Sequence, residues 1–455
     1  MMTQVAHMFL MMDKTTGMHA EKFLSTSSAR ALVEGRLDFS TLVESRIHGM
    51  RDEDVNPALG DSHFVSSTTL ASGAANTVYL VTYDDGSEYV FKPEAAGRQG
   101  MAELTYSRDY MPWQQVVHLN LATQATADSL GLGDIMSKST TGCHKKQFGL
   151  FMEKAPGMTG RNFAKDDNGP PGHLTAAQVR SLPAKQYGQV VGQIIRQTNR
   201  LEWFDLLTGQ GDRHHGNYMI DVTHGGTVTF KCIDNDESFP AYRTGLQKYT
   251  LDKYDAHFFD TKLDEIIARY PEKYHAEVRA RIEAEAEKAV TTLPNGGIVV
   301  DASKFKSPEL FYALRKTVGI QTSVLPDFID ADLYERLMRL KAGDERDKYI
   351  ANLSSRLPQK AVDSAIARLD EAIAHAEKLN ELKMVIQPRD FAQQDVQNRL
   401  FAKTFQQGPN PFQATEDGRF RLTPSDDVTK LAANSTRPVF IRDLFSAIAK
   451  PGWFK

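Results

Sequence analysis

Strand and helix patterns occupy separate parts of this 455-residue chain, and this separation constrains the fold more than any single motif does. Segments 68–81 and 88–92 are rich in β-branched and aromatic residues and flank an Asp85-Gly86 turn, which predicts a hairpin. Other elements indicated by periodicity are helices over 114–132 and 175–209, strands over 146–153, 218–222 and 227–233, and long helices over 276–290 and 360–382. The predicted class is α+β, with a β-rich part, a helical part and a helical extension.

Composition narrows the class of protein. A content of 41% hydrophobic and 25% charged residues is typical of a globular chain long enough for two or three domains. The net charge is −4, from 54 basic and 58 acidic residues, which argues against a general nucleic-acid binder. The net charge does not exclude a local basic patch that binds a phosphate or makes a peripheral contact with a membrane surface.

Cysteine usage and the N-terminal sequence indicate the compartment. Cys143 and Cys232 have no neighbour at metal-ligand spacing and cannot form a disulfide framework, which predicts a reducing, cytosolic site of action. The apolar run Val5–Met12 is too short to span a bilayer and lacks a basic flank, so neither a transmembrane segment nor a signal peptide is expected. Secretion into another cell by an unconventional route would leave the same pattern.

The segment from Thr208 to Asp221 carries the strongest chemical signal. Asp212 and Asn217 lie five residues apart between a long apolar helix and a strand, and Asp234 follows the next strand. Protein kinases use this order, with an aspartate for the acceptor hydroxyl and then an asparagine and a second aspartate for magnesium. The spacing predicts phosphoryl transfer from ATP with Mg²⁺ bound by Asn217 and Asp234.

A lysine expected to contact the nucleotide precedes this segment. Lys92 lies on the second strand of the predicted hairpin and can bind the α- and β-phosphates. Within the segment 68–81, a glycine-containing turn with Ser72, Gly73 and Ala74 can cover phosphates with backbone N–H groups. This turn has a single glycine and is a weak signal by itself. It supports nucleotide binding only because it precedes Lys92 and the segment with Asp212, Asn217 and Asp234 in the order that kinases use.

The motif Gly211-Asp212-Arg213-His214-x-x-Asn217 resembles the catalytic loop of phosphatidylinositol 3- and 4-kinases. Phe91-Lys92-Pro93 and Ile233-Asp234-Asn235 are similar to segments of type II phosphatidylinositol 4-kinases, and the resemblance covers about residues 64–245. Bacterial effector kinases injected into host cells also use such a pared-down fold.

The resemblance implies a protein-kinase-like two-lobe fold: a mobile leader at 1–63, an N-lobe at 64–152, a C-lobe at 153–330, and a helical extension with a loop-rich tail at 331–455. The catalytic group implied by it comprises Asp212, Lys92, Arg213 and His214. Of these, His214 is expected to support the loop backbone. Met152 and Glu153 would contribute backbone atoms to adenine binding.

Two departures from the family pattern stand out. Asp236 replaces a usual glycine, and the acidic partner of Lys92 is not obvious, with Glu103 and Asp128 as candidates. If neither pairs with Lys92, a host activating factor could complete the site. Arg243, Lys248 and Lys253 form either a basic patch for the acceptor or an ordinary solvated stretch.

The expected function is therefore transfer of the γ-phosphoryl group to a hydroxyl of a phosphoinositide or a protein. Two alternatives remain open. One is another nucleotide-dependent transfer, either of AMP or in a carboxylate ligation. The other is a pseudokinase without activity that binds a partner through its helical extension.

Overall fold

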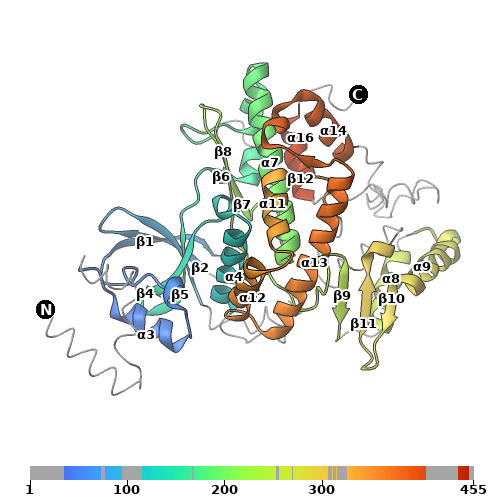
Figure 1. Cartoon of the computed structure of the whole chain (residues 1–455), viewed down its shortest axis with the longest axis horizontal. Helices are drawn as coiled ribbons and strands as arrows, with labels where there is room; N and C mark the ends of the chain where they lie inside the picture. Colours follow the sequence, from blue (N-terminus) through green and yellow to red (C-terminus); the bar gives the residue numbers. More distant parts are fainter. Residues whose placement is uncertain are drawn as a thin grey trace. The chain divides into compact units, whose positions relative to one another are not determined.

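The computed structural model describes residues 35–72, 77–94, 115–165, 169–252, 256–268, 270–305, 310, 314, 325–405 and 439–449. The chain divides into two compact units (Figure 1). Unit 1 comprises 1–104, 108–121 and 137–154, and unit 2 comprises 105–107, 122–136 and 155–455. The predicted α+β class is confirmed, because unit 1 is built on a sheet and unit 2 is mainly helical.

Unit 1 is a five-stranded antiparallel sheet in the order β1-β2-β3-β5-β4. Its strands are β1 (Phe64–Ser72), β2 (Thr77–Tyr83), β3 (Glu88–Pro93), β4 (Ser139–His144) and β5 (Gln147–Glu153), and its helices are α3 (Phe39–Ile47), η2 (Asp52–Asp54) and the first half of α4 (Gln115–Ser129). The Asp85-Gly86 hairpin is confirmed and joins β2 to β3, with Gly86 at φ +79°. The single strand expected over 68–81 is instead two strands, β1 and β2, that pair with each other.

The sheet of unit 1 has an apolar cluster on each face. One contains Leu59, Val81, Tyr83, Phe91 and Phe151, all nearly inaccessible to solvent. The other brings Val117 and Leu121 of α4 against β4 and β5. The described part of the predicted leader, 35–63, belongs to this packing: the Thr41 hydroxyl donates to Leu59 O at 2.6 Å and accepts from the Cys143 N–H at 3.0 Å.

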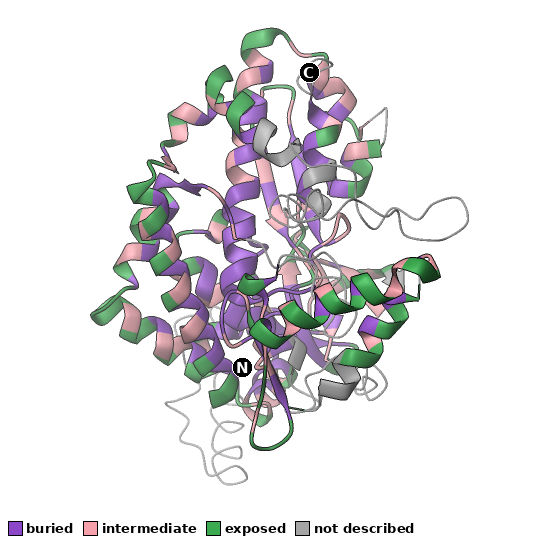
Figure 2. Ribbon diagram, turned by 90° about the vertical axis from the view of Figure 1, so that its right-hand side faces the viewer, coloured by how far each residue is buried: buried purple, intermediate pink, exposed green. Residues whose placement is uncertain are grey.

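Helix α7 (Ala184–Thr208) runs through unit 2, and its C-terminal half is buried on all sides (Figure 2). The helix pattern over 175–209 is interrupted at Ser181–Pro183, because α6 (Ala176–Arg180) ends there and Pro183 precedes the first turn of α7. Unit 2 also contains the three-stranded sheet β6-β7-β8. β6 (Met158–Thr159) precedes α7 in the sequence, and β7 (Tyr218–Val222) and β8 (Val228–Cys232) follow it, close to the two predicted short strands.

The last part of the described chain packs on α7 rather than forming a separate body. The Trp203 indole and the Asn199 amide both donate to Phe328 O, at 2.9 and 3.0 Å, and Arg196 pairs with Asp330 at 2.6 Å. The elements of this region are β12 (Ile329–Asp330), α11 (Ala331–Arg339), α12 (Asp344–Ser354), α13 (Gln359–Glu381), β13 (Val385–Ile386), η6 (Pro388–Ala392), α14 (Gln394–Phe405) and α16 (Val439–Ile448).

Between β8 and β12 in the sequence, the chain forms a small α+β region with its own apolar core. It contains the sheet β10-β11-β9, which the sequence did not predict. Its elements are β9 (Lys248–Leu251), α8 (Ala256–Ile267), η4 (Glu272–Tyr274), α9 (His275–Ala289), β10 (Val290–Thr292), β11 (Ile298–Asp301) and η5 (Ala302–Lys304). The remaining short elements of unit 2 are η3 (Gly133–Ile135) and α5 (Gly160–Lys165). None of the helices that the structure describes is both long and apolar enough to cross a bilayer.

Candidate functional site

The candidate site in unit 2 begins where α7 ends. Gly209 follows the last helical residue with φ +71°, a left-handed conformation that glycine adopts without a steric penalty. A Cβ at this position would lie only 2.9 Å from Cδ of Pro240. The chain therefore turns sharply out of the helix, and the segment 210–217 leads from it to β7.

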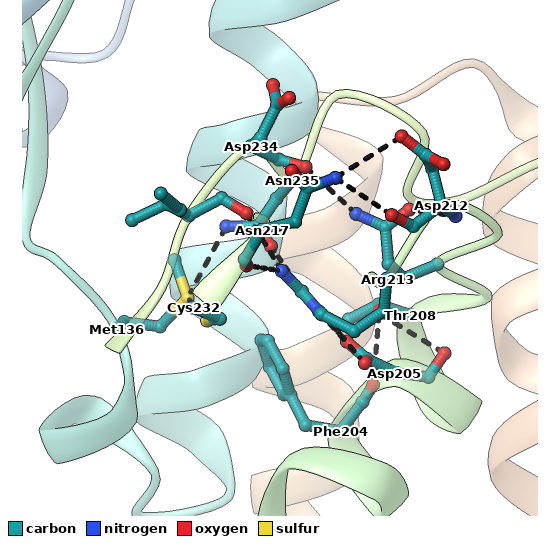
Figure 3. A network of polar contacts seen from close by, with 12 residues as sticks. Met136, Phe204, Asp205, Thr208, Asp212, Arg213, Asn217, Cys232, Asp234 and Asn235 are labelled. Carbon is teal, nitrogen blue, oxygen red and sulfur yellow. Dashed lines mark hydrogen bonds and ion pairs between the residues drawn. The ribbon is translucent and has the colours of Figure 1, made fainter. Parts of the chain in front are cut away.

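Arg213 is the centre of a buried polar network that joins three segments (Figure 3). Its side chain is 3% exposed, and all five N–H groups have an acceptor. Nε and Nη2 donate to the Asp205 carboxylate at 3.0 and 2.9 Å, and Nη2 also donates to Oδ1 of Asn235 at 2.7 Å. Nη1 donates to Asn217 O and Ile233 O.

This network ties the last turns of α7 to the segments on either side of the β7–β8 hairpin. Because every donor of Arg213 is used inside the protein, the arginine predicted in the catalytic group is built as a positioning residue. The sequence prediction assigned no role to Asp205, and it named Asn235 only as part of the segment Ile233-Asp234-Asn235. Only their type gave a signal, as a carboxylate inside an apolar helix pattern and an amide beside Asp234.

Gln210 links the two predicted acidic residues through their backbones, and sequence reasoning also missed it. Its Oε1 accepts from the Asp212 N–H and its Nε2 donates to Asp234 O, both at 3.1 Å. The side chain is 3% exposed, so these contacts are shielded from water. A buried amide that bridges two backbones in this way holds the two loops in a fixed register.

Asp212, Asn217 and Asp234 are brought together by these contacts. Nδ2 of Asn217 donates to Asp212 O at 2.8 Å and to Asp212 Oδ2 at 3.2 Å. Partial burial raises the pKa of the Asp212 carboxyl, and the nearby Asp234 carboxylate raises it further, while His214 lowers it. Asp234 itself has φ +56°, an uncommon conformation for a residue other than glycine.

The side chain of His214 contacts the backbone of the loop. Its Nδ1 accepts from the Gly216 N–H at 2.9 Å, and its Nε2 lies 3.9 Å from Oδ2 of Asp212. The imidazole is 42% exposed. With Nδ1 as an acceptor, a neutral ring carries its proton on Nε2, on the side of Asp212.

The oxygen donors suit a hard divalent cation. A carboxylate of Asp234, an amide oxygen of Asn217 and the adjacent Asp212 are ligand types that Mg²⁺ prefers, and Mg²⁺ is commonly bound through one or two carboxylates plus substrate phosphates. Since Nδ2 of Asn217 is used by Asp212, its amide oxygen is the atom left to face a cation. Within the described ranges, no group of three or more His, Cys, Asp or Glu side chains is placed to hold a metal ion.

The predicted nucleotide-contacting residues are in unit 1, on adjacent strands. Lys92 lies on β3, 7% exposed, opposite Leu150 of β5. Met152 and Glu153 end β5, where the Glu153 N–H donates to Lys138 O at 2.8 Å. Ser72 is the last residue of β1, whereas Gly73 and Ala74 lie outside the described residues.

Two acidic residues are the candidates for pairing with Lys92. Glu103 falls outside the described residues, and Asp128 is exposed in the last turn of α4, in unit 2. Asp236 lies in the turn that follows Asp234.

Arg243 fits neither alternative given for the basic residues after Asp234, a patch for the acceptor or a solvated stretch. Its side chain is 1% exposed, donates to Leu246 O at 2.9 Å and lies over the Tyr249 ring. Lys248 is 3.4 Å from Glu371 Oε1, and Lys253 is outside the described residues.

No protein-family model matches the sequence, and a search of curated proteins finds no match. Among solved structures, the chain is similar to the Helicobacter pylori proinflammatory kinase CtkA, at 11% identity over 70% of this chain and 96% of that one, with a TM-score of 0.30. It is also similar to the Golgi casein kinase with Mn/ADP bound, at 12% identity over 76% and 79% of the chains, with a TM-score of 0.36.

A third similar structure is the amicoumacin kinase hAmiN in complex with AMP-PNP and Ca²⁺, at 18% identity over 79% and 98% of the chains, with a TM-score of 0.20. With TM-scores between 0.20 and 0.36, these similarities are too loose to indicate what this chain binds or does.

Proposed function

We propose that this chain is an ATP- and Mg²⁺-dependent phosphotransferase that acts on a hydroxyl group. The observation that carries the proposal is the constellation of Asp212, Asn217 and Asp234, which lie on two loops held in register by Arg213 and Gln210. Phosphoryl transfer depends mainly on positioning and charge neutralisation. A pair of loops held in register would supply the positioning, and their oxygen donors would hold the Mg²⁺ that neutralises phosphate charge.

Each residue has a defined task in this proposal. Asp212 accepts the hydrogen bond, and then the proton, of the acceptor hydroxyl, and the Asn217 amide fixes its Oδ2. Partial burial raises the pKa of Asp212 above its ordinary value, which makes this carboxylate a better proton acceptor than an unperturbed aspartate. Asn217 and Asp234 would hold Mg²⁺, which neutralises phosphate charge when bound. Lys92 would contact the α- and β-phosphates.

Among acceptors, a phosphoinositide is the first to test, because Gly211–Asn217 resembles the catalytic loop of phosphatidylinositol kinases. A protein acceptor is the second. ATP labelled on the γ-phosphate, given with mixed phosphoinositides or with a cell lysate, separates the two. Transfer of label from the α-phosphate alone would show AMP transfer and contradict the proposal.

Thermal unfolding with and without ATP and Mg²⁺ tests the nucleotide site directly. A ligand that binds only the native state stabilises it by mass action, by about 2.7 kcal/mol at a hundred times its Kd. We expect a magnesium-dependent rise in Tm for the wild type that is lost in Asp234→Ala. Asp264→Ala is the control, since that carboxylate is 58% exposed on α8. No rise in the wild type would contradict the proposal.

A further inference from the structure

One face of helix α13 contacts the two backbone segments that flank the candidate site. Ser364, Arg368 and Glu371 follow at spacings of four and three residues, which places them along the same side of the helix. α13 packs beside α7 in unit 2 (Figure 1). These three side chains contact the end of α7 and the segment 241–246 that follows Asp234.

Arg368 is fully buried and binds backbone carbonyls. Its Nε donates to Leu207 O at 3.0 Å, its Nη2 to Thr208 O at 3.4 Å and its Nη1 to Arg243 O at 2.7 Å. The last carbonyls of a helix have no partner within the helix and carry partial negative charge. A guanidinium at this point therefore caps α7 where the segment 210–217 begins.

The same guanidinium joins the segment after Asp234 to that helix end. Arg243 O and Thr208 O share it, and the Phe239 N–H donates to Thr208 O at 2.6 Å. A Cβ on Gly209 would lie 3.1 Å from Cζ of Arg368, so the arginine packs directly against the turn out of α7. A change in this side chain would therefore affect the end of α7 and the backbone at Arg243 together.

Ser364 and Glu371 extend the contact along α13. The Ser364 hydroxyl donates to Ala241 O at 2.7 Å, and Glu371 Oε2 accepts from the Leu246 N–H at 2.7 Å. The other oxygen of Glu371 lies 3.4 Å from Nζ of Lys248. Backbone groups of Ala241, Arg243 and Leu246 are thus each bound by one side chain of the helix.

We propose that this face of α13 positions the Asp212 and Asp234 loops, with Arg368 as the main positioning residue. None of the three side chains is part of the predicted kinase motifs, and all lie in the segment expected to be an extension. The structural part of this inference stands alone, whereas its catalytic consequence rests on the proposed phosphotransferase function.

Hydrogen exchange of the full-length chain tests the structural part without reference to activity. In Arg368→Gln we expect amides of 208–217 and 239–246 to exchange roughly 10-fold faster or more, because local opening no longer breaks the carbonyl contacts. Amides of β4 and β5 in unit 1 should be unchanged. Arg346→Gln is the control, since it removes the Arg346–Asp370 ion pair between α12 and α13 at 2.7 Å.

Two results would overturn the proposal: equal exchange in Arg368→Gln and Arg346→Gln, or a uniform increase throughout unit 2. If Arg368→Gln does not fold, Glu371→Met decides. Faster exchange confined to 241–248 would support the proposal, and unchanged exchange there would refute it.

Activity supplies the second readout. We expect kcat of Arg368→Gln to fall on the order of 100-fold with little change in KM for ATP, as for a misplaced catalytic group. A wild-type protein that transfers no phosphoryl group would contradict the proposed function. The hydrogen-exchange result would still test whether α13 positions the two loops. Faster exchange in an active variant with normal kcat would show that α13 does not position the catalytic groups.

Discussion

Replacing Arg213 by alanine separates a positioning residue from a catalytic one. If Arg213 acted on substrate, its loss would reduce activity and leave stability almost intact. In the structure, its five N–H groups are all bound within the protein and its ion pair with Asp205 is buried, at 3% and 8% exposure. We therefore expect Arg213→Ala to lose both stability and activity.

The size of the stability loss follows from what the arginine leaves behind. Removal of one partner of a buried ion pair typically costs about 3–5 kcal/mol. Ile233 O and Asn235 Oδ1 also lose the hydrogen bonds they receive from Arg213, whereas Asn217 O keeps one from the Ile233 N–H at 3.1 Å. A loss of about 3–5 kcal/mol is a large part of the free energy of unfolding of a typical domain, which is roughly 5–15 kcal/mol.

Burial already raises the pKa of Asp205, and Arg213 opposes this rise. In Arg213→Ala that opposition is gone, so the folded protein binds a proton on Asp205 more tightly than the unfolded chain does. A raised folded-state pKa stabilises at low pH, and this contribution is lost as the pH rises through that pKa. The deficit of the variant should therefore be smaller at pH 5 than at pH 8.

Urea unfolding followed by circular dichroism, at both pH values, measures these effects. The Asp205→Ala/Arg213→Ala double variant should cost much less than the sum of the two single variants, because neither charge is left unpaired. A loss below about 1 kcal/mol for Arg213→Ala, or strict additivity in the double variant, would refute the reasoning.

Further predictions concern the turn out of α7 and the two thiols. Gly209→Ala should destabilise the protein by at least about 1–2 kcal/mol in urea unfolding, because φ is +71° and the new Cβ would meet Pro240 at 2.9 Å; unchanged stability would contradict this. Burial raises the pKa of the Cys232 thiol to about 11 and that of Cys143 to about 12. Neither should react with iodoacetamide at pH 8 until urea unfolds the chain, and rapid labelling of the native protein would show the burial to be incorrect.

Local patterns predicted the elements that depend on near neighbours. The hairpin at Asp85-Gly86 and the helices at 275–289 and 359–381 follow from turn chemistry and periodicity, which act over a few residues. The division of 68–81 into two strands was missed because strand composition alone does not mark where one strand ends and its hairpin partner begins. In the sheet β10-β11-β9, β9 was missed because its partner β11 lies far along the chain.

For the candidate site, the sequence by itself determined which groups are present and in what order: Asp212, Asn217 and Asp234, at spacings that suit phosphoryl transfer. Only the tertiary structure decided what holds them. Gln210 bridges neighbouring loops, and Arg368 arrives from a helix about 160 residues later in the chain. Such contacts join segments by burial and backbone hydrogen bonding, which carry no fixed sequence spacing, so no motif could have revealed them.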